Sequence, residues 1–339
     1  MVFKLTRTVY HTWTKLTPRV LLTDGIRQSS VDARRKLSSN CYHLDCSSAK
    51  RIVDKYDTIL LDCDGVIWGT DHVSRMDKVN EALYKLRQHG KQLLFVTNNS
   101  LYSTNTFFDK FVQYGFDINH DEIFCITSAT AFYLKSVLGV KKSVYVIGSE
   151  AMGTELQNLK IDHFGIGPEP DSTSRKIDDL LDMHFRDDVE AVLVGFDEYL
   201  CYNKLYKASS YLQDPDCHFV VTSDVEMGTK IGPNRYRPSV GTVVGAVSAA
   251  AYPRKYTVVG KPSSFLYKFI KLKFPELNLN KIITIGDSLR SDVKFAKNIG
   301  SDSALVLSGA SDMQTLLNTL DMDKPNYYFQ NLALFAEVL

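Results

Sequence analysis

Residues Thr58–Trp68 read T-I-L-L-D-C-D-G-V-I-W. The apolar run Ile59–Leu61 is typical of a strand that is buried on both faces of a parallel sheet. Asp62 and Asp64 follow this run, and because side chains alternate along an extended chain, both carboxylates can face one site. Gly65 then permits a turn with positive φ or a close approach of a ligand to the backbone. The stretch therefore predicts a carboxylate pair at the carboxyl end of a strand, where open parallel sheets bind ligands.

Two neighbouring carboxylates repel each other unless they share a proton or a cation lies between them. Mg2+ takes oxygen ligands and is commonly held by one or two carboxylates together with a substrate phosphate. The alternative is a strand that ends in two solvated aspartates before a glycine turn. The rest of the sequence has to decide between these interpretations.

The composition indicates a globular protein of two domains, or one core with a large insertion. The chain has 339 residues, of which 44% are hydrophobic and 23% are charged, and both fractions are ordinary. No apolar run reaches the 18 residues of a membrane-spanning helix, so no membrane association is expected. A formal net charge of +1 argues against nucleic acid as the main partner.

The six cysteines show neither the spacing of a metal site nor a disulfide framework. We expect reduced thiols and a cytoplasmic protein. Residues 1–51 carry ten basic and three acidic residues. This segment is interpreted as a disordered basic extension, and a mitochondrial transit peptide is the alternative.

Alternating apolar runs and amphipathic stretches predict an α/β protein with a parallel sheet. Residues 52–136 form the first part of the predicted core, 137–252 a second, inserted α/β unit, and 253–339 the second part of the core. Within the inserted unit, residues 228–241 are rich in Gly and Pro and are expected to form a loop before a helix. The run at residues 256–260 is assigned to the core, and residues 123–128 to a short strand.

Polar side chains follow several of the predicted strands. Asp62 and Asp64 end one strand, Thr97-Asn98 ends another, and Gly286-Asp287 ends a third. Lys261 follows a fourth apolar run. Each has a plainer interpretation when taken alone, such as a turn, a helix N-cap or a solvated lysine. Their occurrence together, each after an apolar run, favours a shared site.

The shared site suits phosphoryl transfer. Asp62 can attack phosphorus and form an aspartyl-phosphate, and Asp64 can serve as general acid and base. Donors for the phosphoryl oxygens are expected from Thr97, Asn98 and Lys261. Asp287 adds a carboxylate for Mg2+, and Asp292 can orient the metal ligands.

Four motifs in this order resemble those of the haloacid dehalogenase superfamily of phosphatases. They read D-C-D-G-V (62–66), T-N-N-S (97–100), G-K-P-S (260–263) and G-D-S-L-R-S-D (286–292). The continuation Ile67-Trp68 is similar to the branch with phosphoglycolate, pyridoxal phosphate and 4-nitrophenyl phosphatases. The resemblance implies that Asp62, the backbone carbonyl of Asp64, and Asp287 bind Mg2+. It also implies a Rossmann-like core in which residues 137–252 form an inserted α/β cap. The resemblance covers roughly residues 53–335.

Departures from the branch lie where substrate choice is expected to be set. The chain reads Leu101-Tyr102-Ser103-Thr104 where the branch commonly has a Thr-Lys-Ser-Arg run, Ser288 replaces an Arg, and Ser223 departs from the usual cap sequence. The resemblance implies a small phosphate monoester as substrate, with 2-phosphoglycolate or glycerol 3-phosphate first and pyridoxal 5′-phosphate as the alternative. It also implies a homodimer through the cap. A phosphomutase and a catalytically silent scaffold protein are the rival hypotheses.

Overall fold

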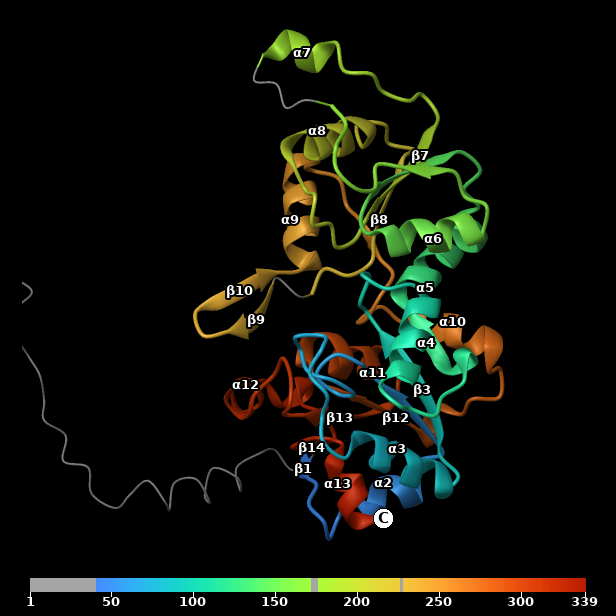
Figure 1. The fold of residues 1–339 in the computed structure, drawn as a ribbon, viewed down its shortest axis with the longest axis vertical. Helices are drawn as coiled ribbons and strands as arrows, with labels where there is room; N and C mark the ends of the chain where they lie inside the picture. Colours follow the sequence, from blue (N-terminus) through green and yellow to red (C-terminus); the bar gives the residue numbers. More distant parts are fainter. Residues whose placement is uncertain (1–40, 172–175, 226–227) are drawn as a thin grey trace, which may run out of the picture. The chain divides into compact units, whose positions relative to one another are not determined.

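The computed structural model describes residues 41–171, 176–225 and 228–339. It contains two α/β parts, and a seven-stranded sheet forms the centre of the first (Figure 1). All neighbouring strands in it are parallel. In spatial order the strands are β1 (Tyr42–His43), β14 (Tyr327–Phe329), β13 (Asp302–Val306), β12 (Ile282–Gly286), β2 (Thr58–Leu61), β3 (Gln92–Thr97) and β4 (Ile123–Cys125).

Strand β2 is buried on both faces, as its apolar run predicts. Ile59 and Leu61 belong to one hydrophobic cluster, whereas Leu60 belongs to a second one. All three side chains are fully buried. Successive side chains point to opposite faces, so the sheet must be covered on both sides. Strand β2 is therefore a central strand, and its carboxyl end lies in the middle of one edge of the sheet.

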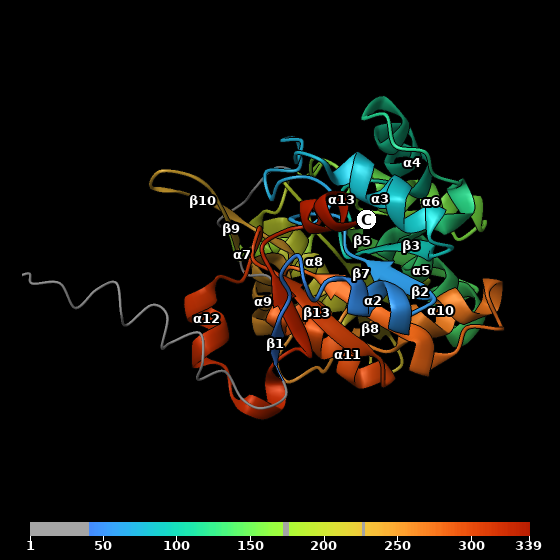
Figure 2. The ribbon, with the colours of Figure 1, turned by 90° about the horizontal axis from the view of Figure 1, so that it is seen from below.

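Helices cover the two faces of this sheet. The first cluster receives side chains from α2 (Lys50–Lys55), α3 (Val79–Gln88), α4 (Thr104–Gln113) and α13 (Ala333–Val338). The second receives side chains from α5 (Ile126–Phe132), α10 (Phe265–Lys273) and α11 (Lys294–Ile299). Figure 2 shows α3 and α13 side by side, and these two helices are in contact. The fold is therefore the predicted Rossmann-like core.

A second, five-stranded parallel sheet is inserted between β4 and β12 of the first sheet. Its order is β11 (Thr257–Val258), β8 (His218–Val221), β7 (Val189–Val194), β5 (Ser143–Ile147) and β6 (His163–Phe164). Its helices are α6 (Glu150–Asn158), α7 (Ile177–Leu181), α8 (Tyr202–Tyr211) and α9 (Val240–Ala250). This insertion is the predicted α/β cap, and the assignment of its first residue to position 137 stays a prediction.

The predicted N-terminal extension has to be shortened. Within residues 41–51, β1 pairs with β14 of the core sheet, and α2 begins at Lys50. The backbone N–H of Tyr42 donates to the Asn326 carbonyl at 2.8 Å, and Leu44 is buried. A two-residue strand produces no periodicity, which is why the sequence did not indicate it. Residues 1–40 lie outside the described part, so the basic extension and the transit peptide stay predictions.

Three further expectations need correction. The run at residues 256–260 supplies β11, which pairs with β8 of the cap sheet and not with the core, so the predicted boundary at residue 252 is too early. The predicted loop at 228–241 contains an antiparallel hairpin of β9 (Gly228–Gly232) and β10 (Arg235–Pro238). The strand predicted at 123–128 ends at Cys125, where α5 follows directly.

One more helix, α12 (Met313–Asn318), follows β13. Among the described residues, every helix is too short or too polar to span a bilayer.

Candidate active site

Asp62 directly follows β2, at the carboxyl end of a strand that lies between β12 and β3. Its backbone N–H donates to the Ile285 carbonyl at 2.9 Å, which continues the ladder with β12. Cys63, the next residue, is fully buried in the first hydrophobic cluster. Alternation along the chain thus sends the Cys63 side chain into the core and leaves the carboxylates of Asp62 and Asp64 facing one pocket.

The ammonium group of Lys261 lies against Asp62. Its Nζ donates to Asp62 Oδ1 at 2.7 Å, to Asp292 Oδ1 at 2.7 Å and to the Val96 carbonyl at 2.8 Å. The lysine side chain is only 2% exposed. The two carboxylates raise the pKa of Lys261 although burial alone lowers it. The lysine therefore stays charged in a site where an unpaired cation would be costly.

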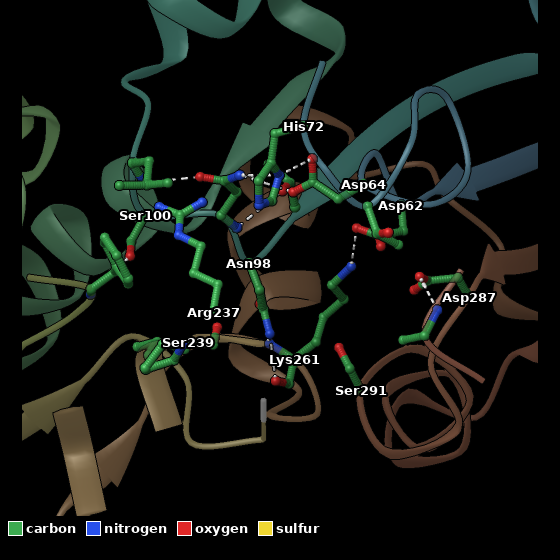
Figure 3. Close-up of a pocket in the computed structure, with 18 residues that line it drawn as sticks. Asp62, Asp64, His72, Asn98, Ser100, Arg237, Ser239, Lys261, Asp287 and Ser291 are labelled. Carbon is green, nitrogen blue, oxygen red and sulfur yellow. Dashed lines mark hydrogen bonds and ion pairs between the residues drawn. The ribbon is translucent and has the colours of Figure 1, made fainter. Parts of the chain in front are cut away.

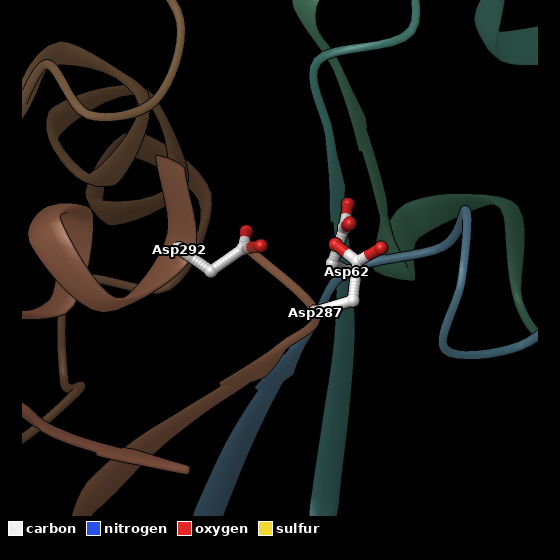
Figure 4. A group of neighbouring side chains, drawn as sticks. All are labelled: Asp62, Asp287 and Asp292. Carbon is white, nitrogen blue, oxygen red and sulfur yellow. The ribbon is translucent and has the colours of Figure 1, made fainter. Parts of the chain in front are cut away.

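Three carboxylates converge at this point. One ligand oxygen from each of Asp62, Asp287 and Asp292 can be chosen so that all lie within 4.8 Å of one another (Figure 4). Asp287 follows β12, and its Oδ2 accepts the backbone N–H of Ala310 at 2.7 Å. Asp292 lies on the π-helical turn η4 (Leu289–Val293) and accepts the backbone N–H of Ser288 at 3.1 Å.

Glycines leave the room that the Asp287 carboxylate occupies. A Cβ atom at Gly65, whose φ is +79°, or at Gly309 would overlap the carboxylate of Asp287. Gly65 therefore has the positive φ that its position after the aspartate pair predicts, and the space beside it is occupied by the Asp287 carboxylate,. These two glycines allow the acidic cluster to form.

The charge balance of the cluster favours a cation. Lys261 is paired with Asp62 and Asp292, two of the three carboxylates, and burial raises the pKa of Asp62 to about 8 although Lys261 acts in the opposite direction. A hard divalent ion that takes carboxylate oxygens would relieve this repulsion. The donor set therefore fits Mg2+.

Asp64 is held by a separate set of donors. Its Oδ1 lies 2.8 Å from His72 Nδ1 (Figure 3). The same oxygen accepts the indole N–H of Trp68 at 2.6 Å, and Oδ2 accepts the Asn99 amide at 2.9 Å. Burial raises the pKa of Asp64, but the hydrogen bonds from His72, Asn99 and Trp68 outweigh it and the net shift is downward. The side chain of Asp64 is not part of the three-carboxylate cluster. Of the predicted metal ligands, Asp64 could thus contribute through its backbone carbonyl.

The predicted phosphate-binding residues lie at the same site with different local partners. Asn98 brackets the backbone of Lys261, since its Oδ1 accepts the Lys261 N–H and its Nδ2 donates to the Lys261 carbonyl, both at 2.8 Å. Thr97 Oγ1 accepts the backbone N–H of Asn99 at 3.0 Å. Asn98 therefore fixes the segment that carries Lys261, and both residues also line the pocket.

A pocket of about 110 Å³ joins these groups to the cap. The predicted residues Asp62, Asp64, Thr97, Asn98, Lys261 and Asp287 all line it, whereas Asp292 lies behind Lys261. Phe196, Arg237 and Ser239 of the cap complete the wall.

Sequence reasoning assigned no role to His72 or Arg237. His72 has a positive φ of 65°, which no local pattern announced. Arg237 lies on the hairpin that was predicted to be a loop. No sequence pattern marks either residue, because the contacts of both depend on tertiary structure.

Two family models match the chain. Residues 59–162 match the family model of haloacid dehalogenase-like hydrolases, and residues 258–334 match a HAD-hydrolase-like model. The chain is 34% identical over 290 residues to chloroplastic phosphoglycolate phosphatase 1A of Arabidopsis thaliana, covering 85% of this chain and 78% of that protein. It is 31% identical over 309 residues to human glycerol-3-phosphate phosphatase, covering 87% and 94%.

Solved structures share the fold. A 4-nitrophenylphosphatase from Thermotoga maritima superposes with a TM-score of 0.69 at 24% identity, covering 85% of this chain and 99% of that one. A glycerol phosphate phosphatase from Mycobacterium tuberculosis, solved in complex with magnesium, superposes with a TM-score of 0.68 at 20% identity and covers 84% and 78%. The chain belongs to the haloacid dehalogenase-like hydrolase family and is a phosphoric monoester hydrolase of its phosphoglycolate, glycerol-3-phosphate and 4-nitrophenyl phosphatase branch.

Proposed function

We propose that this protein hydrolyses small phosphate monoesters in a Mg2+-dependent reaction that passes through an aspartyl-phosphate on Asp62. One observation carries the proposal. The Asp62 carboxylate lies at the end of a central buried strand, 2.7 Å from the Lys261 ammonium, and shares a cluster with Asp287 and Asp292. A nucleophile, a buried cation and further acidic ligands at one point are the parts that phosphoryl transfer needs.

The metal would be held by the carboxylates of Asp62 and Asp287 and by the backbone carbonyl of Asp64. When bound, Mg2+ would neutralise negative charge on the transferring phosphoryl group. Asp292 would act from behind, since its ion pair with Lys261 fixes the ammonium beside Asp62. Its closeness to the cluster also lets it orient the metal ligands,.

The first step is the attack of an Asp62 carboxylate oxygen on phosphorus. The bond from phosphorus to the ester oxygen breaks, and Asp64 gives its proton to the departing alcohol. In the second step Asp64 takes a proton from a water molecule whose oxygen attacks phosphorus. The acyl-phosphate bond breaks, inorganic phosphate leaves, and Asp62 is restored.

Asp64 must hold a proton in the first step, although its donors lower its pKa in the free protein. A phosphate dianion that binds next to Asp64 is also negatively charged, and the repulsion raises the pKa of Asp64. Substrate binding therefore favours the protonated form that the first step requires. The same three donors then stabilise the carboxylate that the second step uses.

The substrate class is a small phosphate monoester, with 2-phosphoglycolate as our first choice and glycerol 3-phosphate as our second. The names of the two relatives support both. Pyridoxal 5′-phosphate is the alternative, and a silent scaffold is disfavoured because Asp62, Asp64, Lys261 and Asp287 are all present. A homodimer through the cap and a cytoplasmic or mitochondrial location stay predictions.

The test is phosphate release from a panel of esters by the purified protein, with Mg2+ and with EDTA. The panel contains 2-phosphoglycolate, glycerol 3-phosphate, pyridoxal 5′-phosphate and 4-nitrophenyl phosphate. We expect Mg2+-dependent release with a clear preference for one of the first two. A folded protein that binds Mg2+ and hydrolyses none of them would overturn the proposal and support the scaffold hypothesis.

A further inference from the structure

One cation in the pocket is not used by the proposed chemistry. Arg237 on β10 lines the pocket from the cap side, and Figure 3 draws it among the residues around Asn98 and Ser100. In the described part of the chain its guanidinium makes neither a hydrogen bond nor an ion pair. The guanidinium lies over the ring of Phe196, whose centre is 4.8 Å from the guanidinium carbon. The planar group therefore keeps its five N–H donors for a ligand.

The ring that supports Arg237 is itself fixed in place. The backbone N–H of Phe196 donates to Ser100 Oγ of the core at 3.2 Å. The next residue, Asp197, forms a buried ion pair with Lys204 at 2.6 Å. Stacking on a fixed aromatic face reduces the conformational freedom that a long arginine side chain would otherwise lose when it binds a ligand. The guanidinium is thus placed in the pocket before a ligand arrives.

Lys261, the buried cation of the pocket, is already engaged. Lys261 donates to Asp62 and Asp292, so it serves the end of the pocket where the phosphoryl group is transferred. Arg237 comes from a different segment and has no carboxylate partner in the described chain. An arginine is the side chain best suited to bind a carboxylate with two parallel hydrogen bonds. The two cations therefore suit a ligand with two anionic groups.

We propose that Arg237 recognises a carboxylate on the alcohol portion of the substrate, so that the enzyme prefers phosphate monoesters of small hydroxy acids to those of neutral alcohols. This inference rests on the proposed phosphatase function and narrows its substrate class. It places 2-phosphoglycolate, which carries a carboxylate, ahead of glycerol 3-phosphate, which carries two neutral hydroxyl groups.

The test compares the kcat/KM values of 2-phosphoglycolate and 2-hydroxyethyl phosphate, in which a neutral alcohol replaces the carboxylate. Arg237→Gln removes the charge and retains a polar side chain that is shorter. A charged hydrogen-bonded pair contributes about 1.5–3 kcal/mol, so we expect the ratio of the two kcat/KM values to fall about 10–100-fold. The loss should appear mainly as a higher KM for 2-phosphoglycolate, because the contact is present in the bound substrate as well as in the transition state.

Arg235→Gln is the matched control, since Arg235 lies on the same strand, is exposed and does not line the pocket. Its ratio should equal that of the unmodified protein. An unchanged ratio of the two kcat/KM values in Arg237→Gln would overturn the inference. If both kcat/KM values fell equally, Arg237 would be placed at the transferred phosphate instead of at the carboxylate. Hydrolysis of 4-nitrophenyl phosphate by the unmodified protein separates this failure from failure of the proposed function. If that ester is also inert, the proposed function itself falls.

Discussion

Replacing Lys261 with methionine should lower kcat strongly and destabilise the core. The lysine supplies donors to two carboxylates at 2.7 Å and to a backbone carbonyl at 2.8 Å, and its side chain is 2% exposed. Removing one partner of a buried charge network costs about 3–5 kcal/mol, because the remaining charges stay buried without compensation. Loss of a donor that stabilises the transition state lowers kcat by about 10²–10³-fold.

The assays are urea unfolding and phosphate release from 4-nitrophenyl phosphate. Because a divalent cation would supply the missing positive charge, the loss of unfolding free energy should become smaller when Mg2+ is added. Lys207→Met is the control. Lys207 also joins two carboxylates, those of Glu169 at 2.7 Å and Asp171 at 2.6 Å, but it lies on α8 and outside the pocket.

The control should lose less stability, since Lys207 and Asp171 are more exposed than Lys261 and Asp292. The turnover of Lys207→Met should stay within about threefold of that of the unmodified protein. Its free energy of unfolding should respond to Mg2+ no more strongly than that of the unmodified protein. The reasoning is refuted if Lys261→Met retains turnover within tenfold, or if its destabilisation is the same with and without Mg2+.

Two further substitutions test the rest of the site. In Gly309→Ala the new Cβ would overlap the Asp287 carboxylate, so we expect the Mg2+ concentration for half-maximal phosphate release to rise about 10–100-fold. The control Gly245→Ala, where a Cβ meets nothing within 4 Å, should leave this concentration unchanged. An equal Mg2+ response in both variants would contradict the assignment of Asp287. His72→Ala removes a hydrogen bond that lowers the pKa of Asp64, so this pKa should rise. The limb of the pH–rate profile that reports Asp64 should then move to higher pH, and kcat should fall about tenfold. An unshifted profile would show that His72 does not act on Asp64.

The sheet could be predicted because burial on both faces leaves a strong signal. Ile59, Leu60 and Leu61 are apolar without alternation, and the structure sends them to two different clusters. The carboxylates after such strands were also predictable, because strand ends in a parallel sheet share one edge. Asp62, Asp287 and Lys261 meet there although up to 225 positions separate them in the sequence.

The hairpin of β9 and β10 was missed for a physical reason. Arg235 and Tyr236 are both exposed, so the strand has no buried face and no alternation to detect. A turn signal was present, since Pro233-Asn234 connects the strands and Asn234 adopts a φ of +56°. Gly and Pro between two strands are as typical of a hairpin as of a loop.

The role of Arg237 was outside the reach of sequence patterns. It depends on the ring of Phe196 and on the placement of a cap hairpin over the core site. His72 is only eight residues from Asp64, yet its contact requires a backbone turn with φ of +65° at a residue other than glycine. Side-chain directions in such turns follow from tertiary packing, which local propensity does not encode.

The most direct test of the central claim compares phosphate release from 4-nitrophenyl phosphate by the unmodified protein and by Asp62→Asn. Asparagine is nearly the same size, so circular dichroism should show the same fold, but its amide cannot serve as the attacking carboxylate. Our account predicts Mg2+-dependent release by the unmodified protein, loss of that release in EDTA, and no release by Asp62→Asn above background. Comparable release by a pure, folded Asp62→Asn protein would contradict the account, because another group would then attack phosphorus.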